Sequence, residues 1–76
     1  MHCSDVSTLA LPNRHNGEID PKVEKYLLNL NPTEWPPIVL RERGRTVLDG
    51  VQRVLIARKY NIKLLPSYRL RFFRLS

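Results

Sequence analysis

The segment from Thr46 to Arg53, which reads Thr-Val-Leu-Asp-Gly-Val-Gln-Arg, constrains the fold more than any other. A short β-prone run ends at Asp49-Gly50 and a helical pattern begins directly after it, so we expect a strand that leads straight into a helix. Anions favour the start of a helix, because its first N–H groups lack partners and its dipole is positive there. Gly50 lets an anion approach the backbone, and Arg53 lies one turn into the helix, in reach of a phosphate. The junction is therefore the first candidate for a functional site.

Size and composition predict one small domain. The chain has 76 residues, of which 42% are hydrophobic, and we expect a flexible N-terminus at 1–5 and a single domain at 6–76. The lone cysteine excludes an internal disulfide and an all-cysteine zinc site. No apolar run is as long as a membrane span, and the start of the chain lacks the pattern of a signal peptide. We therefore expect a cytoplasmic protein that does not bind membranes.

The net charge of +6 is unevenly distributed. Residues 1–38 carry three basic and five acidic residues, a net charge of −2, whereas residues 39–76 carry ten basic and two acidic residues, a net charge of +8. A cationic half of this kind favours nucleic acid, a nucleotide or an acidic protein surface as partner. A basic surface that only keeps the protein in solution is the alternative.

The N-terminal half predicts one strand and one helix. The weakly alternating segment Val6 to Leu11 is expected to form a strand, followed by a turn at 12–17. Asp20-Pro21 is typical of an N-cap and the first residue of a helix, and Asn31-Pro32 should end that helix. The residues with the spacing of a buried helix face are Val23, Tyr26, Leu27 and Leu30.

The C-terminal half predicts a hairpin, a helix and a last strand. The hairpin strands are Ile38–Leu40 and Thr46–Leu48, with a turn at Glu42–Arg45. Asp49 should cap the helix, and Asn61 should end it in the left-handed conformation. The apolar stripe of this helix is expected to comprise Val51, Val54, Leu55 and Tyr60. In the last strand, after Pro66, one face should carry Tyr68, Leu70 and Phe72 and the other Arg69, Arg71 and Phe73. The order strand-helix-hairpin-helix-strand indicates an α+β fold with a small mixed sheet.

Over roughly residues 6–73, the chain resembles the ParB/sulfiredoxin superfamily, and in particular the ParB-like N-terminal domain. The similar features are Pro37–Leu40, the charged turn, Asp49-Gly50-x-x-Arg53, Ala57-Arg58 and Leu65-Pro66. The resemblance implies a strand-to-helix turn that holds nucleotide phosphates or lies near DNA, and a plasmid or phage setting. The residues that it implies for phosphate binding are Gly50, Gln52, Arg53, Asn13 and Arg14.

The departures from that pattern argue against catalysis. The position of the sulfiredoxin nucleophile holds Val51, which cannot attack phosphorus or sulfur. Val51, Gln52 and Leu55 also replace an acidic and two basic residues of the partition proteins, and histidines are missing from the first two of these positions. We therefore expect no catalytic residues and no required cofactor, although a bound nucleotide stays an option.

A few other side chains could bind a metal, act as a base or stack on a nucleobase, but structural roles explain them more simply. His2, Cys3 and His15 are too few and too loosely placed for a metal site, so no metal is expected. Glu18 and Asp20 could act as a base, but a loop residue and an N-cap are the simpler interpretations. Trp35 could stack on a base, but beside prolines it is expected to cover the core.

Arginines on the hairpin and the last strand exceed what protection of a sheet edge requires. They are expected to contact nucleic acid or another acidic partner, and they are Arg41, Arg43, Arg45, Arg69 and Arg71. The sequence thus favours a non-catalytic module that binds nucleic acid or a nucleotide phosphate. A small inhibitor that binds an acidic protein is the alternative, and a kinase-like enzyme with Asp49 or Glu18 as base is less favoured. A homodimer is left open.

Overall fold

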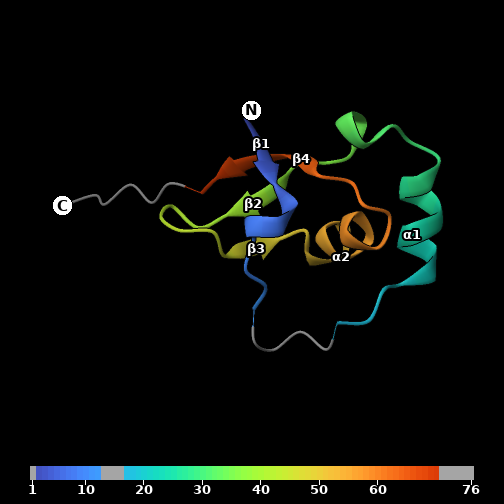
Figure 1. Ribbon diagram of the computed structural model, residues 1–76, viewed down its shortest axis with the longest axis horizontal. Coiled ribbons are helices and arrows are strands. Elements are labelled where there is room, and N and C mark those ends of the chain that lie inside the picture. Colours follow the sequence, from blue (N-terminus) through green and yellow to red (C-terminus); the bar gives the residue numbers. More distant parts are fainter. Residues whose placement is uncertain (1, 13–16, 71–76) are drawn as a thin grey trace.

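A computed structural model describes residues 2–12 and 17–70 (Figure 1). These residues form a small α+β fold of two helices and a four-stranded mixed sheet. The elements are β1 (His2–Asp5), the 3₁₀ turn η1 (Val6–Thr8), α1 (Pro21–Leu28), the 3₁₀ turn η2 (Pro32–Glu34), β2 (Ile38–Leu40), β3 (Val47–Asp49), α2 (Val51–Lys59) and β4 (Leu64–Arg69). The predicted order strand-helix-hairpin-helix-strand is confirmed.

The sheet has the order β1-β4-β2-β3, so β4, the last strand of the described residues, lies inside the sheet between β1 and β2. β4 runs antiparallel to β1 and parallel to β2, and both β1 and β2 place a residue opposite Ser67. β2 and β3 form the predicted antiparallel hairpin, with a register shift between Val39 and Leu40. The last strand begins at Leu64 rather than after Pro66, because the φ angle of proline is compatible with an extended backbone.

The prediction for the first strand was wrong in position. Residues 2–5, expected to be flexible, pair with β4, and Val6–Thr8 form a 3₁₀ turn instead of a strand. Asp5 starts this turn, because its side chain accepts a hydrogen bond from the Ser7 N–H at 3.0 Å. Side chains three residues apart are eclipsed in a 3₁₀ turn, which explains why Val6 and Leu9 are both buried.

The sheet is strongly curled. Ala10 pairs with the outer edge of β3, through bonds of 2.9 Å to the Arg45 carbonyl and from the Val47 N–H. In a flat sheet, about 19 Å would separate this position from β1, at ~4.8 Å for each strand step. The five residue-to-residue steps from Asp5 to Ala10 span at most about 17 Å when fully extended, and the 3₁₀ turn shortens them further. The two edges of the sheet must therefore bend toward each other.

The first helix begins as predicted and ends early. Asp20 is the N-cap, with its carboxylate accepting from the Lys22 N–H at 2.9 Å, and Pro21 is the first helical residue. The helix ends at Leu28, and Asn31 instead caps the short turn η2. Of the predicted buried face, Leu27 is buried and Val23 and Leu30 pack against the core, but Tyr26 is exposed.

The second helix lies between the sheet and α1 (Figure 1). Its C-terminus is a Schellman motif: Asn61 has a φ of 57°, as predicted, and the N–H groups of Asn61 and Ile62 bond to the carbonyls of Arg58 and Ala57. The predicted stripe was partly wrong. Val54 is buried, but Ile56 and Ala57 are buried with it, while Tyr60 is exposed. A helix enclosed on two sides buries more than one stripe, which the expected pattern did not allow for.

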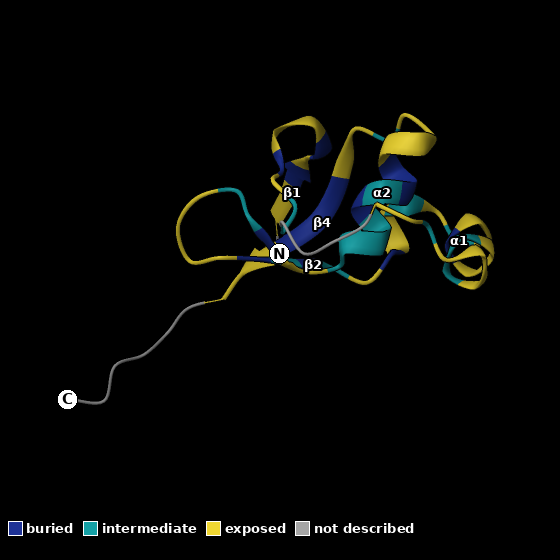
Figure 2. Cartoon of the chain, turned by 90° about the horizontal axis from the view of Figure 1, so that it is seen from below, coloured by how far each residue is buried: buried dark blue, intermediate teal, exposed yellow. Residues whose placement is uncertain are grey.

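One hydrophobic core joins these elements. Figure 2 shows the middle of β4 and the adjacent part of α2 as buried, and the hairpin loop as largely exposed. The buried hydrophobic residues are Val6, Leu9, Leu27, Trp35, Ile38, Leu40, Val47, Val54, Ile56, Ala57 and Leu65. Trp35 covers the core as expected and donates a 2.9 Å hydrogen bond to the Leu27 carbonyl. No helix in the described ranges is long and apolar enough to cross a membrane.

Candidate functional site

The strand-to-helix turn has the predicted position, but its cap differs. Asp49 ends β3, and the N-cap of α2 is Gly50, with a φ of 99° and no side-chain capping bond. A Cβ at Gly50 would lie 2.5 Å from Arg53 Nη1 and 2.7 Å from Ile38 Cγ2. Both the left-handed backbone and the internal packing therefore require this glycine, whether or not an anion binds.

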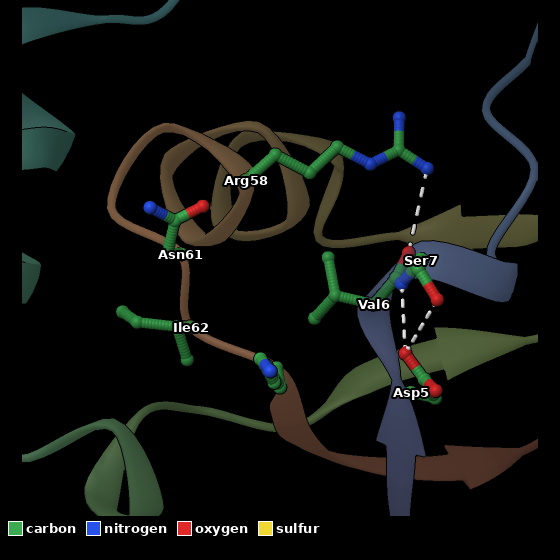
Figure 3. A pocket seen from close by; sticks show the side chains of 7 residues that line it. Asp5, Val6, Ser7, Arg58, Asn61 and Ile62 are labelled. Atoms are coloured by element: carbon green, nitrogen blue, oxygen red, sulfur yellow. Dashed lines mark hydrogen bonds between the residues drawn. The ribbon is translucent and has the colours of Figure 1, made fainter.

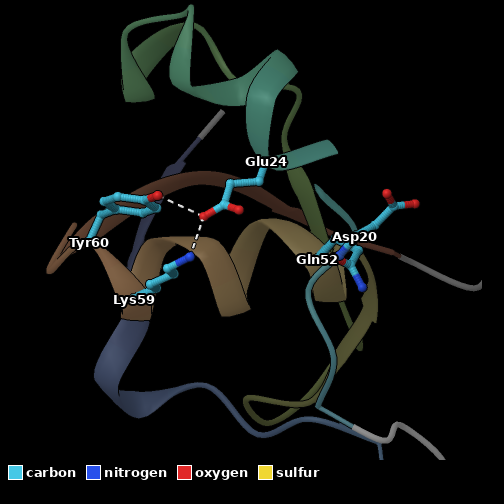
Figure 4. A network of polar contacts seen from close by, with 5 residues as sticks. All are labelled: Asp20, Glu24, Gln52, Lys59 and Tyr60. Atoms are coloured by element: carbon cyan, nitrogen blue, oxygen red, sulfur yellow. Dashed lines mark hydrogen bonds and ion pairs between the residues drawn. The ribbon is translucent and has the colours of Figure 1, made fainter. Parts of the chain in front are cut away.

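The two polar side chains after this glycine have partners inside the protein. Arg53 is half-buried and donates from Nη1 to the Pro37 carbonyl at 3.1 Å. The Gln52 amide accepts from the Asp20 N–H and donates to the Glu18 carbonyl, both at 2.8 Å, so it fixes the loop before α1 (Figure 4). A role of Gln52 and Arg53 in phosphate binding stays a prediction, and each has a structural role as well.

An open hollow of about 330 Å³ lies beside this turn. The first residues of α2 line it together with Asp49 and Val23. Two features act in opposite directions there, since uncapped N–H groups attract an anion and the exposed Asp49 carboxylate repels one. Asn13 and Arg14, the other predicted phosphate contacts, lie outside the described residues, as do Arg71 and His15.

The hairpin arginines divide into exposed and anchored groups. Arg41 and Arg43 are exposed, and no ion pair involves either within the described residues. Arg69 donates from Nη1 to the carbonyls of Arg41 and Gly44, at 3.0 and 2.6 Å, and so holds the first half of the hairpin loop. The structure thus brings Arg69 to the hairpin, as the predicted arginine surface requires.

Arg45 does not share the exposed position of the other two hairpin arginines. Its Nε donates to Thr8 Oγ1 at 3.1 Å, and its Nη2 reaches the Asp5 carbonyl at 3.5 Å. It therefore links the β3 edge of the sheet to the segment that follows β1, and helps to hold the curl closed.

Sequence reasoning did not single out three residues near this surface. Tyr68 is 48% exposed on the central strand, where its register partner is Val39. Ser4 and Ser67 are buried and share a hydrogen bond of 2.6 Å between their hydroxyl oxygens. A serine amid the apolar residues of a strand, as in Leu64-Leu65-Pro66-Ser67, was the signal that could have indicated them.

A polar network joins the two helices (Figure 4). Glu24 of α1 accepts from Lys59 Nζ at 2.6 Å and from the Tyr60 hydroxyl at 2.7 Å. These bonds, first that from Lys59 and then that from Tyr60, lower the pKa of Glu24. The bond to Glu24 in turn raises the pKa of Lys59 and of Tyr60. All three groups have internal partners, which indicates a structural role.

The largest hollow, of about 750 Å³, lies between the C-terminus of α2 and the turn η1 (Figure 3). Three of its polar side chains have internal partners. Arg58 donates to the carbonyls of Leu9 and Val6, at 2.7 and 3.5 Å, and Asp5 accepts from the Ser7 N–H and hydroxyl. These hydrogen bonds from Ser7 lower the pKa of Asp5. None of the residues predicted to bind phosphate or nucleic acid lines this hollow, so we do not assign it a ligand.

In the described part of the chain, no group of three histidine, cysteine, aspartate or glutamate residues could hold a metal ion. Cys3 is a free, exposed thiol. Comparisons of the chain with protein-family models, with curated proteins and with solved structures found no match.

Proposed function

We propose that this protein is a small non-catalytic module that binds nucleic acid through its hairpin arginines. One observation carries the proposal: Arg69 donates to two carbonyls of the hairpin loop, so that Arg41 and Arg43 extend from a backbone held by hydrogen bonds, with no carboxylate in ion-pair contact in the described structure. Guanidinium groups held in this way suit phosphate, because little ordering of the loop is needed on binding.

The exposed aromatic residue supports a single strand as the preferred partner. Tyr68 lies next to Arg69 on the central strand, with its ring accessible. A base can stack on such a ring only when it is not paired within a duplex. We therefore infer that arginines contact the backbone of the strand while Tyr68 contacts a base.

The strand-to-helix turn is proposed as a second phosphate contact. The uncapped start of α2 and the unused N–H groups of Arg53 support this role, as does the resemblance to a ParB/sulfiredoxin-like fold. A nucleotide is the alternative ligand there. Because Val51 and Leu55 carry no reactive group and Gln52 does not titrate, we infer binding without turnover.

A protein partner is the second candidate. Leu48 and Leu70 are exposed together with Tyr68, and mixed arginine, aromatic and aliphatic surfaces are typical of protein interfaces. In this alternative the same residues bind an acidic protein surface, as a small inhibitor would. The cytoplasmic location expected from the sequence is part of both proposals.

Binding of labelled oligonucleotides, measured by fluorescence anisotropy across a salt series, tests the proposal. The double variant R41A/R43A should weaken binding and reduce the magnitude of the salt slope by about 1.4–1.8, which is ~0.7–0.9 for each lost phosphate contact. A single strand should bind more tightly than a duplex of the same sequence.

The matched control is K22A/K25A, which removes two exposed positive charges from α1 instead. It should leave the salt slope unchanged. If both double variants reduce the slope equally, binding is non-specific charge attraction and the hairpin is not the site. If the protein binds no oligonucleotide at low salt, the acidic protein partner becomes the better proposal.

A further inference from the structure

A separate polar pocket of about 310 Å³ lies against the strands β1, β4 and β2. Its lining includes the apolar Leu40. It also includes the buried serines Ser4 and Ser67 and the arginines Arg45 and Arg69. Neither Arg41 nor Arg43 lines it, but Arg45, Tyr68 and Arg69 do, so the pocket adjoins the proposed nucleic-acid surface. It is distinct from the hollow at the start of α2, because the two share no residue.

The serines place hydroxyl groups where a small core would otherwise be apolar. Ser67 is only 2% exposed, and its hydroxyl lies 2.6 Å from that of Ser4 and 3.4 Å from the His2 carbonyl. Either hydroxyl can be the donor in the shared bond. When Ser67 donates its one hydrogen to Ser4 rather than to the His2 carbonyl, the Ser4 hydrogen is free for a ligand.

Hydrogen bonds within the protein hold Arg45 and Arg69 in position, and each guanidinium keeps N–H groups that these bonds do not use. Arg45 uses Nε and Nη2 toward Thr8 and Asp5, which leaves its Nη1. Arg69 uses Nη1 toward two carbonyls, which leaves its Nε and Nη2. Their partners are a hydroxyl and backbone carbonyls, and neither guanidinium forms an ion pair in the described structure. The charge of Arg45 also acts on the Asp5 carboxylate, whose pKa it helps to lower.

We propose that this pocket binds a single phosphate group. Two guanidinium groups and a hydroxyl supply donors from different directions, which suits the tetrahedral oxygens of phosphate better than a planar carboxylate. The anchoring bonds fix the donors before the ligand arrives, so little side-chain entropy is lost on binding. Either a free phosphate compound or the terminal phosphate of a nucleic acid strand supplies this group.

Titration followed by two-dimensional NMR of the full chain tests this site. Inorganic phosphate, added at constant ionic strength, should shift the signals of Ser4, Ser67 and the Arg45 and Arg69 side chains. The variant S4A/S67A removes both hydroxyls together, so that neither is left buried without a partner, and should weaken phosphate binding by about tenfold. K22A, which removes a charge from α1, should leave it unchanged.

Comparing an oligonucleotide with and without a 5′-phosphate distinguishes the two possible sources of the bound phosphate group. A 5′-phosphorylated oligonucleotide that binds more tightly than its unphosphorylated form, with the difference lost in S4A/S67A, indicates the end of a strand. Equal binding of the two oligonucleotides, with phosphate still shifting the pocket signals, indicates a free phosphate compound.

The proposal is overturned if phosphate shifts only residues 50–53, or if it shifts nothing up to the millimolar range. It is equally overturned if S4A/S67A, folded by its NMR spectrum, binds phosphate as the parent does. R41A/R43A changes no residue that lines the pocket, so its failure to weaken oligonucleotide binding would count against the proposed function and not against this site.

Discussion

At the scale of single residues, most polar groups near the candidate sites also hold the fold together. Gln52 fixes a loop, Arg53 bonds to a backbone carbonyl, and Arg45 joins two sheet edges. The sequence could indicate which residue types gather near the turn, because glycine and arginine at that spacing suit an anion. It could not show that internal partners occupy these groups, since those partners come from segments 16 to 37 residues away.

Gly50→Ala should lower the free energy of unfolding by about 1–3 kcal/mol, because the added methyl group meets both backbone strain and Ile38. Urea denaturation measures this. Gly44→Ala is the control, as its φ of 88° carries similar strain while no atom lies within 4 Å of the added carbon. Equal losses in the two variants would show that packing against Ile38 and Arg53 contributes nothing.

At the scale of elements, the sequence correctly predicted helix ends and turns that neighbouring residues determine without distant contacts. The Asp20-Pro21 helix start, the Asn61 helix end and the hairpin are all as predicted. The predicted position of the first strand was wrong, because Asp5 caps a 3₁₀ turn that begins at the next residue. The buried side of α2 was partly misjudged because α2 contacts two neighbours, which periodicity in one helix does not reveal.

The contact between the helices should depend on pH through Glu24. Its pKa is lowered in the folded protein, so its contribution to stability is present above the unfolded pKa, near 4.5, and is lost as pH falls through the folded value. The raised pKa values of Lys59 and Tyr60 mean that their contribution is lost as pH rises beyond about 10.

Thermal unfolding of the parent and of Glu24→Gln across this range provides the measurement. The parent should be the more stable at neutral pH, and the difference should disappear in acid and shrink in strong alkali. A difference that is constant at every pH would mean that the ionised carboxylate plays no part in joining α1 to α2.

At the scale of the whole molecule, the curl of the sheet determines which residues meet. It brings Arg45 from the hairpin to Thr8 and Asp5, and the pocket of the two serines lies on strands from both ends of the chain. The sequence predicted a mixed sheet, but strand order and curvature depend on pairing between residues about 60 positions apart. Ser4 and Ser67 could not be recognised as neighbours for that reason.

Arg45→Ala should loosen the link between the sheet edges and lower the free energy of unfolding by about 1–2 kcal/mol, the usual cost of lost hydrogen bonds from a charged group. Hydrogen exchange at the Ala10 and Val47 amides should become faster, because these bonds join the same edges. Arg43→Ala, on the exposed part of the hairpin, should change stability by no more than about 0.5 kcal/mol. Unchanged exchange in Arg45→Ala would show that the curl persists without this link.

The central position of β4 has a consequence for synthesis. Until residues 64–69 have left the ribosome, β1 and β2 lack the strand that both of them pair with. Completion of the described sheet must therefore wait for β4, and contacts this distant along the chain form slowly. During translation, the apolar residues of β2, β3 and α2 stay uncovered, and chaperones have access to them throughout that interval.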